Sequence, residues 1–264
     1  MSNLFVRSLS ALVYAFLFIS AILFSAETYI GLLALFATVC IWEFSKITQI
    51  KSIIPYILLA CITYISFQGT AFKYNDYLFG FTIVGSLILL YLLISSKLIK
   101  TGTLTQKLFL QVIYLILPFY FLMNLPFIEN TYHPNIIISI IFIIWTNDSF
   151  AFLVGKNFGK RKLFEKVSPK KTIEGFTGGL LFSIIAGFII GQYSGIFSIL
   201  DWIIIAIIVA IFGSLGDLVE SKFKRQAKVK DSGTIMPGHG GLLDRLDSLF
   251  FLAPFVYLYI HYIM

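Results

Sequence analysis

The stretch DWIIIAIIVAIFGSLGDLVES, residues 201–221, decides the fold class of this chain. It is almost unbroken in its apolarity, and about 20 such residues are what a helix needs to cross the roughly 30 Å of hydrocarbon in a bilayer. The apolar residues are continuous rather than alternating, which favours a helix over a strand of a membrane barrel. The stretch therefore predicts a transmembrane helix.

Eight more apolar segments lie on either side of it along the chain. The 264 residues are 58% hydrophobic and only 12% charged, whereas a soluble domain carries about twice that share of charge. We therefore expect an all-α, polytopic integral membrane protein that forms a single domain over residues 1–264. The predicted spans, about nine in number, cover residues 8–25, 28–45, 53–69, 77–96, 108–128, 136–155, 177–196, 201–220 and 249–264.

The basic residues predict the orientation of these spans. Nineteen of the 20 Lys and Arg residues fall in alternate polar connections, beginning with the N-terminus, and only Lys73 falls in the others. Cytoplasmic loops carry such an excess of positive charge, so we expect a cytoplasmic N-terminus, two large cytoplasmic loops and a C-terminus outside. The net charge of +7 follows from this topology and from attraction to anionic lipids, and it requires no nucleic-acid partner.

The first large loop is preceded by polar residues inside the sixth span. Asn147 and Asp148 lie there, and a carboxylate at that depth costs a few kcal/mol unless it is paired or binds a cation. A hydrogen bond between helices is one interpretation and a substrate or metal site is the other. Further on, residues 168–175 read as a helix start, at which Lys170 and Lys171 could hold phosphate.

The second large loop brings two pairs of carboxylates to the same membrane face. Asp217 and Glu220 end the eighth span, and Asp244 and Asp247 precede the ninth. A spacing of three places each pair on one helix face. Oxygen-rich clusters of this kind suit Mg²⁺ or Mn²⁺, which also bridge to phosphates. The alternatives are plain surface charge and, for one residue, Asp247 as the cap of the ninth helix.

A glycine-rich run, PGHGG at residues 237–241, stands just before the last acidic pair. Glycines let backbone N–H groups approach a ligand closely, as in phosphate-binding loops, although many such runs are only turns. We expect His239, Gly240 and Gly241 to contact phosphate. A role of His239 as a general base is less favoured, because a phosphate nucleophile needs no deprotonation at neutral pH.

The run SKFKRQAKVKDSGTIMPGHGGLLDRLD, residues 221–247, resembles the signature of the CDP-diacylglycerol synthases, also called phosphatidate cytidylyltransferases. The upstream run from Asn147 through SPKKTIEGFTGG resembles the bacterial members. Residues 1–135 resemble the family only in the number and hydropathy of their spans, so we assign the N-terminal spans there and the catalytic spans and cytoplasmic loops to residues 136–264.

The resemblance implies transfer of CMP from CTP to phosphatidate, which gives CDP-diacylglycerol and pyrophosphate in phospholipid biosynthesis. It also implies one or two Mg²⁺ or Mn²⁺ ions, a homodimer and a place in the bacterial cytoplasmic (inner) membrane. The expected catalytic residues are Asp217, Asp244, Asp247 and His239, and the expected metal ligands are Asp148, Asp217, Asp244 and Asp247. The expected substrate-binding residues are Asn147, Lys170, Lys171, Ser221, Lys224, Arg225, Lys230, Asp231, Gly240, Gly241 and Arg245.

Two other functions compete with this one. A CTP-dependent polyprenol or dolichol kinase would transfer the γ-phosphoryl group of CTP to a lipid instead. A cation transporter would use Asp148 and Asp217 along a path across the membrane. The polar residues gather at one membrane face rather than in a line across it, which favours the enzymes over the transporter.

Overall fold

The computed structural model describes residues 3–69, 75–95, 97–99, 102–236, 238 and 240–264. Helices make up most of this part of the chain, and two short antiparallel hairpins complete it. The helices are α1 (Asn3–Phe24), α2 (Ala26–Thr48), α3 (Ile54–Phe67), α4 (Asn75–Ile94), α5 (Leu104–Gln111), η1 (Val112–Ile116), α6 (Leu117–Asn124), α7 (Pro134–Phe158), α8 (Ile173–Tyr193), α9 (Ile199–Gln226), α10 (Leu243–Leu258) and η2 (Tyr259–Ile263). The hairpins are β1 (Phe127–Ile128) with β2 (Thr131–Tyr132), and β3 (Lys162–Phe164) with β4 (Ser168–Thr172).

The polytopic helical prediction is confirmed. Among the described residues, seven helical segments are long and apolar enough to cross a membrane, and two shorter apolar helices cover Ser10–Phe24 and Ile54–Phe67. One of the seven, Leu104–Asn124, joins α5, a π-helical turn and α6. The prediction placed this segment four residues too late, because the hairpin of β1 and β2 takes the end of the apolar run.

Two helices extend well beyond the predicted spans at the second large loop. Helix α9 continues to Gln226 and α10 already begins at Leu243, whereas the predicted spans end at 220 and begin at 249. Polar residues continue a helix as readily as apolar ones, so the apolar run marks the membrane segment and not the helix end. Ser221, Lys224 and Arg225 therefore lie on a helix rather than in a loop, and Asp247 lies inside α10 and is not its cap.

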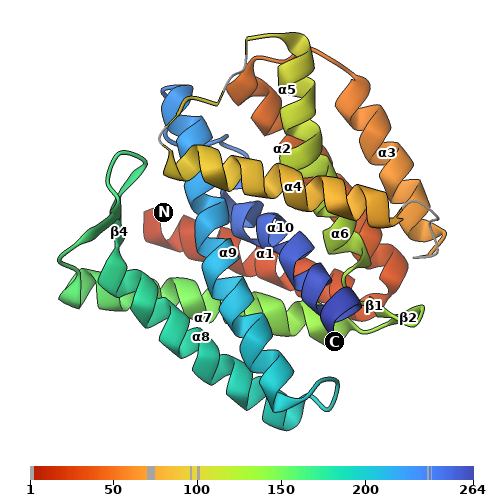
Figure 1. Ribbon diagram of the computed structural model, residues 1–264, viewed down its shortest axis with the longest axis vertical. Helices are drawn as coiled ribbons and strands as arrows, with labels where there is room; N and C mark the ends of the chain where they lie inside the picture. The colour runs from red at the N-terminus through yellow and green to blue at the C-terminus, as the bar shows by residue number, and fades with distance from the viewer. Residues whose placement is uncertain (1–2, 70–74, 96, 100–101, 237, 239) are drawn as a thin grey trace.

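Helix α8 packs on both α7 and α9 (Figure 1). Small residues of α8 face α7 at this contact. A Cβ at Gly178 would lie 2.6 Å from Val154 Cγ2, and one at Gly175 would lie 2.7 Å from the carbonyl oxygen of Ala151. The glycines therefore allow α8 to approach α7 more closely than larger residues would permit, a device common between membrane helices.

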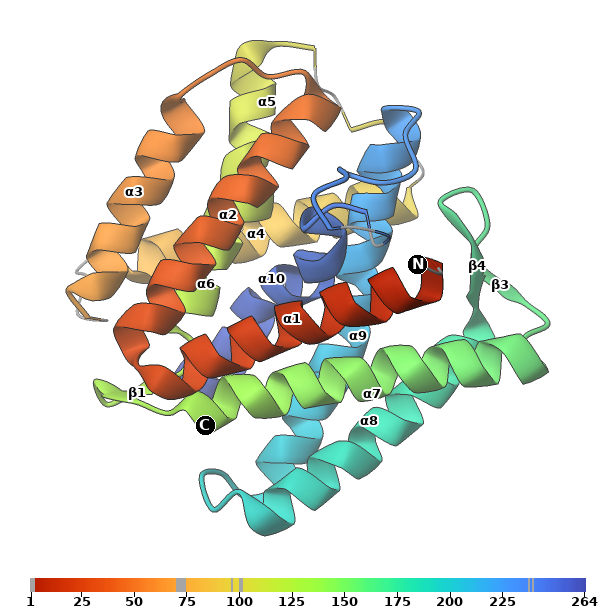
Figure 2. The same ribbon diagram turned by 180° about the vertical axis from the view of Figure 1, so that it is seen from behind.

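Helix α10 lies in the interior of the bundle. In both views it runs between α4 on one side and α1 on the other (Figures 1 and 2). The most apolar stretches of Leu104–Asn124 and Leu243–Ile263 are each 72% buried, against 28–39% for the other five candidate spans. Aromatic rings fill the space between these two central segments, with Phe250 5.2 Å from both Tyr114 and Phe119 between ring centroids. The acidic start of α10 is thus held inside the protein.

Candidate active site

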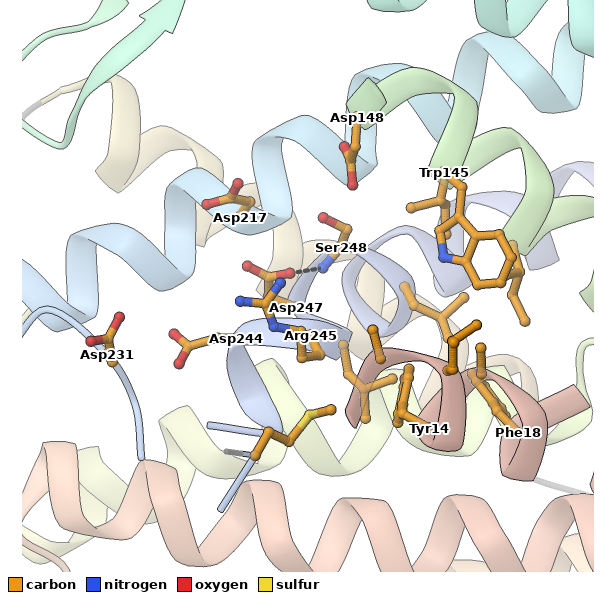
Figure 3. Close-up of a pocket in the computed structure, with 18 of the residues that line it drawn as sticks. Tyr14, Phe18, Trp145, Asp148, Asp217, Asp231, Asp244, Arg245, Asp247 and Ser248 are labelled. Carbon is orange, nitrogen blue, oxygen red and sulfur yellow. Dashed lines mark hydrogen bonds between the residues drawn. The ribbon is translucent and has the colours of Figure 1, made fainter. Parts of the chain in front are cut away.

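A cavity of about 670 Å³ opens at the start of α10. Figure 3 shows Asp148 from α7, Asp217 from α9 and Asp247 from α10 around one end of it. A second cavity of about 320 Å³, lined by Lys170 and Lys171, shares Asp148 and Asp217 with the first. The two cavities therefore share two lining carboxylates that come from different helices.

The other end of the first cavity is apolar. Tyr14 and Phe18 of α1 face Trp145 and its neighbours on α7 there (Figure 3). The lining of this end is completed by Ala11, Leu12, Ala15, Ile141 and Ile144. One continuous cavity thus offers a charged end and a hydrocarbon-like end, the arrangement that an amphiphilic ligand requires.

Three carboxylates form a compact cluster at the charged end. Each of Asp217, Glu220 and Asp247 offers an oxygen within 4.8 Å of the other two. Glu220 is fully buried and Asp247 nearly so. Asp217 and Glu220 share a face of α9 because they are three residues apart, as the sequence predicted. Asp247 reaches them from α10, where the two helices cross.

Gly216 sets the distance between these two helices. A Cβ there would lie 2.7 Å from Phe251 Cβ and 2.9 Å from the carbonyl oxygen of Asp247. Both contacts are closer than real side chains allow, so only glycine permits α10 to pack this near to α9 at this level. The crossing that brings Asp247 to Asp217 and Glu220 therefore depends on a glycine at position 216.

Two lysines partly compensate the negative charge. Lys171 Nζ lies 2.7 Å from Asp217 Oδ2. Lys224 pairs with Glu220 one turn away and, at 2.5 Å, with Asp244 Oδ1. Four carboxylates thus share two described ion-pairing lysines, which leaves acceptor oxygens in excess.

The donor set fits a divalent cation held by Asp217, Glu220 and Asp247. Mg²⁺ and Mn²⁺ prefer oxygen ligands, and Mg²⁺ commonly uses one or two carboxylates together with water and phosphate. Lys224 pairs with Glu220 Oε2, but Glu220 Oε1 is buried and has no hydrogen-bond partner among the described residues. Such an oxygen is costly unless something positive meets it.

This cluster overlaps with the predicted metal ligands without being identical to them. Asp217 and Asp247 were among the predicted ligands, and the third carboxylate of the cluster is Glu220. Asp148 lines both cavities but lies outside the cluster. The predicted ligand roles of Asp148, Asp217, Asp244 and Asp247 all remain predictions.

Asp244 has a different environment, because both of its oxygens already accept hydrogen bonds. Oδ1 accepts from Lys224, and Oδ2 accepts from Ser232 N at 2.9 Å, Ser232 Oγ at 3.0 Å and Gly241 N at 2.9 Å. These bonds connect α10 to the segment between α9 and α10. Asp244 therefore holds this segment in place in the structure.

The glycine-rich run has strict backbone requirements. Gly238 and Gly240 have φ of +75° and +93°, values that favour glycine. The N–H of Gly241, which we expected to contact phosphate, donates to Asp244 instead. Pro237 and His239 lie outside the described residues, and the roles predicted for His239 and Gly240 remain predictions.

Asn147 forms a hydrogen bond between helices, which was one of the two interpretations of this residue in the sequence. Its Nδ2 donates to Ser214 Oγ on α9 and to Asp148 Oδ1, both at 3.4 Å. Its Oδ1 is buried and has no hydrogen-bond partner among the described residues. Asn147 thus lines the second cavity, whereas its buried Oδ1 lies against Gly179 of α8.

Lys170 and Lys171 lie on strand β4 and not in the first turn of a helix. The helix start predicted nearby is real, because Thr172 caps α8 by accepting from Gly175 N at 3.1 Å. Glu174 then accepts from the backbone N–H groups of Lys160 and Arg161, which fastens the base of the hairpin to α8. The hairpin so held presents both lysines to the second cavity.

The remaining predicted residues fall into two groups. Ser221 donates to Asp217 Oδ1 at 3.2 Å, and Asp231 and Arg245 line the wall of the first cavity. Arg225, by contrast, donates to the carbonyl oxygens of Val167 and Val229 and so connects loops, and Lys230 is exposed away from both cavities. The structure brings the first group to the carboxylates and leaves the second group outside.

One functional candidate was missed in the sequence. Glu43 is completely buried on α2 and contacts the start of α10 through hydrogen bonds. The available signal was its charge inside the predicted span 28–45, since intramembrane carboxylates are rare and need partners. Its partners lie about 200 residues away, and no sequence spacing could reveal them.

Comparison with known proteins gives consistent matches. A model of the cytidylyltransferase family matches residues 5–263. Proteins of Bacillus subtilis (strain 168), Staphylococcus saprophyticus and Staphylococcus aureus (strain COL) are 47%, 50% and 52% identical over 116, 114 and 114 residues. Each of the three is called a phosphatidate cytidylyltransferase. The alignments cover 42–44% of this chain and 43–44% of each relative, so they span less than half the length of the curated relatives.

Proposed function

The chain belongs to the cytidylyltransferase family, and we propose that it transfers CMP from CTP to phosphatidate. The products are CDP-diacylglycerol and pyrophosphate. The observation that carries the proposal is the first cavity, whose apolar end suits acyl chains and whose charged end suits a phosphate-bound cation. The names of the three relatives point to the same reaction.

The chemistry is an in-line displacement at phosphorus. A phosphate oxygen of phosphatidate attacks the α-phosphorus of CTP, a new P–O bond forms, and the bond from the α-phosphorus to the oxygen bridging to the β-phosphate breaks. The electron pair leaves with pyrophosphate. Both reactants are polyanions, so the protein must chiefly align them and offset their repulsion.

Asp217, Glu220 and Asp247 would hold a divalent cation between the two reactants. When bound, such a cation neutralises phosphate oxygens and orients the leaving group. Asp148, which lines both cavities, would accept a second ion or orient the first. Mg²⁺ or Mn²⁺ is the chemical class that these oxygens favour.

The protein's own cations would complete the charge balance. Lys171 holds Asp217 through its 2.7 Å ion pair and stands beside Lys170 at the second cavity. Arg245 lines the first cavity from α10. We assign the triphosphate to these three side chains, because phosphate oxygens are the acceptors that ammonium and guanidinium groups prefer.

Phosphatidate would lie with its acyl chains between α1 and α7 and its phosphate at the carboxylate cluster. Tyr14, Phe18 and Trp145 form the apolar wall in this arrangement. The multi-pass helical fold suits a substrate that never leaves the bilayer. We further propose a bacterial cytoplasmic membrane location, a site at the cytoplasmic face and a homodimer, each as a prediction from the family resemblance and the charge pattern.

The test uses purified protein in detergent with phosphatidate, Mg²⁺ and CTP labelled either on cytosine or on the γ-phosphate. Asp217→Asn is run beside the parent, and Glu165→Gln, at an exposed hairpin position, is the matched control. We expect the cytosine label in lipid and pyrophosphate in solution for the parent and the control but not for Asp217→Asn.

Other outcomes would reject the proposal in distinguishable ways. Movement of the γ label into lipid would identify a lipid kinase. If neither label moves in folded protein, uptake of divalent cations into liposomes without CTP would identify the transporter.

A further inference from the structure

The buried carboxylate of Glu43 has no role in the chemistry described above. It lies on α2, one of the N-terminal spans, and is completely buried. It accepts hydrogen bonds from Leu242 N at 3.2 Å and Leu243 N at 2.8 Å, and from Ser232 Oγ at 3.2 Å, whose single hydroxyl hydrogen it shares with Asp244. All three donors belong to the second half of the chain, so one side chain connects the two halves.

Glu43 caps a helix that lacks a cap of its own. The residue at the N-cap of α10 is Leu242, which has no side-chain oxygen and makes no capping bond. The first N–H groups of a helix need acceptors, and a negative charge is most favourable there. Glu43 supplies both requirements from α2.

The segment before α10 is shaped around this carboxylate. A Cβ at Gly233 or at Gly241 would collide with the Glu43 carboxylate or with the Ser232 hydroxyl beside it. Ser232 Oγ lies within hydrogen-bond distance of Glu43 and of Asp244 alike. The backbone at 232–233 and 241–243 thus encloses the Glu43 carboxylate, and this fit indicates a specific contact between α2 and the start of α10.

The position of α10 decides the position of Asp247, one turn beyond the capped N–H groups. Asp247 reaches the cluster only where the start of α10 crosses α9 at Gly216. We propose that Glu43 is a positioning residue, which fixes the start of α10 from α2 and so holds Asp247 against Asp217 and Glu220. The inference rests on the proposed function for its kinetic consequence, but its structural part does not.

Glu43→Gln tests the proposal with little change of volume. Glutamine keeps one acceptor oxygen but turns an N–H donor toward the backbone N–H groups of Leu242 and Leu243. We expect amide hydrogen exchange of these two residues to speed up roughly tenfold or more, as for buried donors that lose a charged acceptor. We also expect a higher Mg²⁺ concentration for half-maximal rate and a kcat lowered about tenfold. Glu27→Gln is the matched control, on the same helix at an exposed position.

The Mg²⁺ requirement separates positioning from mere stability. Partial unfolding lowers the amount of active protein but leaves the half-maximal Mg²⁺ concentration of the folded molecules unchanged. Parental exchange at Leu242 and Leu243 in Glu43→Gln, or an unchanged Mg²⁺ requirement, would overturn the proposal. If Glu43→Gln does not fold, Ser232→Ala removes only the shared hydroxyl, and it must still accelerate exchange at the start of α10.

The two proposals can fail separately. A parent protein that makes no CDP-lipid rejects the proposed function. The exchange of the Leu242 and Leu243 amides then still decides whether Glu43 fixes α10.

Discussion

Gly216→Ala adds one methyl group at the crossing of α9 and α10. The new Cβ would lie 2.7 Å from Phe251 Cβ, whereas ordinary carbon contacts begin near 3.4 Å, so the two helices must separate locally by about 0.7 Å. Overpacking of this kind costs about 1–3 kcal/mol. Replacing glycine by alanine inside a helix returns about 1 kcal/mol, so the net loss of stability is about 0–2 kcal/mol.

Activity should fall much further than stability does. The methyl group also meets the carbonyl oxygen of Asp247, at 2.9 Å, so the displacement acts directly on a cluster residue. A misplacement of about 1 Å can cost on the order of a hundredfold in rate. We therefore expect kcat to decrease by about tenfold to a hundredfold. The assay is cytosine-label transfer to lipid, with thermal unfolding measured on the same sample.

Gly213→Ala is the matched control for this prediction. Gly213 lies one turn earlier on α9, and a Cβ there would be 3.5 Å from Leu252 Cδ2, an ordinary contact. This variant should gain up to about 1 kcal/mol in stability and keep the parental rate. If Gly216→Ala is as active as Gly213→Ala, the crossing does not set the geometry of the cluster and the reasoning is refuted.

Two further predictions concern the charges of the site. Lys171→Met removes the 2.7 Å partner of Asp217 and should lower kcat/KM about tenfold or more. Lys162→Met, at an exposed position on the other strand of the hairpin, should leave kcat/KM unchanged, and equal rates of the two variants in steady-state assays would exclude a role of Lys171. Removal of divalent ions by a chelator should abolish transfer, and added Mg²⁺ or Mn²⁺ should restore it. Ca²⁺ should restore less activity, because it prefers more ligands at longer distances. Transfer that survives the chelator would contradict the cation site.

The sequence predicted the membrane spans well because the bilayer imposes a strong and local requirement. Each helix must place about 20 apolar residues in hydrocarbon, and that pattern is legible without any partner. The ends of α9 and α10 were placed wrongly because helix continuation into water depends on tertiary contacts. Lys224, for example, lies on α9 where it joins Glu220 to Asp244.

The sequence predicted that carboxylates gather at one membrane face, but it identified only some of the residues that form the cluster. The spacing of three correctly placed Asp217 and Glu220 on one face of α9. The same spacing does not show which of Asp244 and Asp247 faces α9, because that depends on the crossing at Gly216. Glu43 was beyond prediction because its hydrogen bonds join residues 199 and 200 positions apart.

The bond between Glu43 and α10 has a consequence for biosynthesis. The ribosome synthesises α2 about 200 residues before α10, since the bonds span that separation. At roughly 5–20 residues per second this interval lasts about 10–40 s. During that time the nascent chain holds a carboxylate in an apolar span before its amide donors exist. The carboxylate cluster is therefore completed late in translation, and a chain arrested before residue 243 has Glu43 but lacks both Leu243 N–H and Asp247.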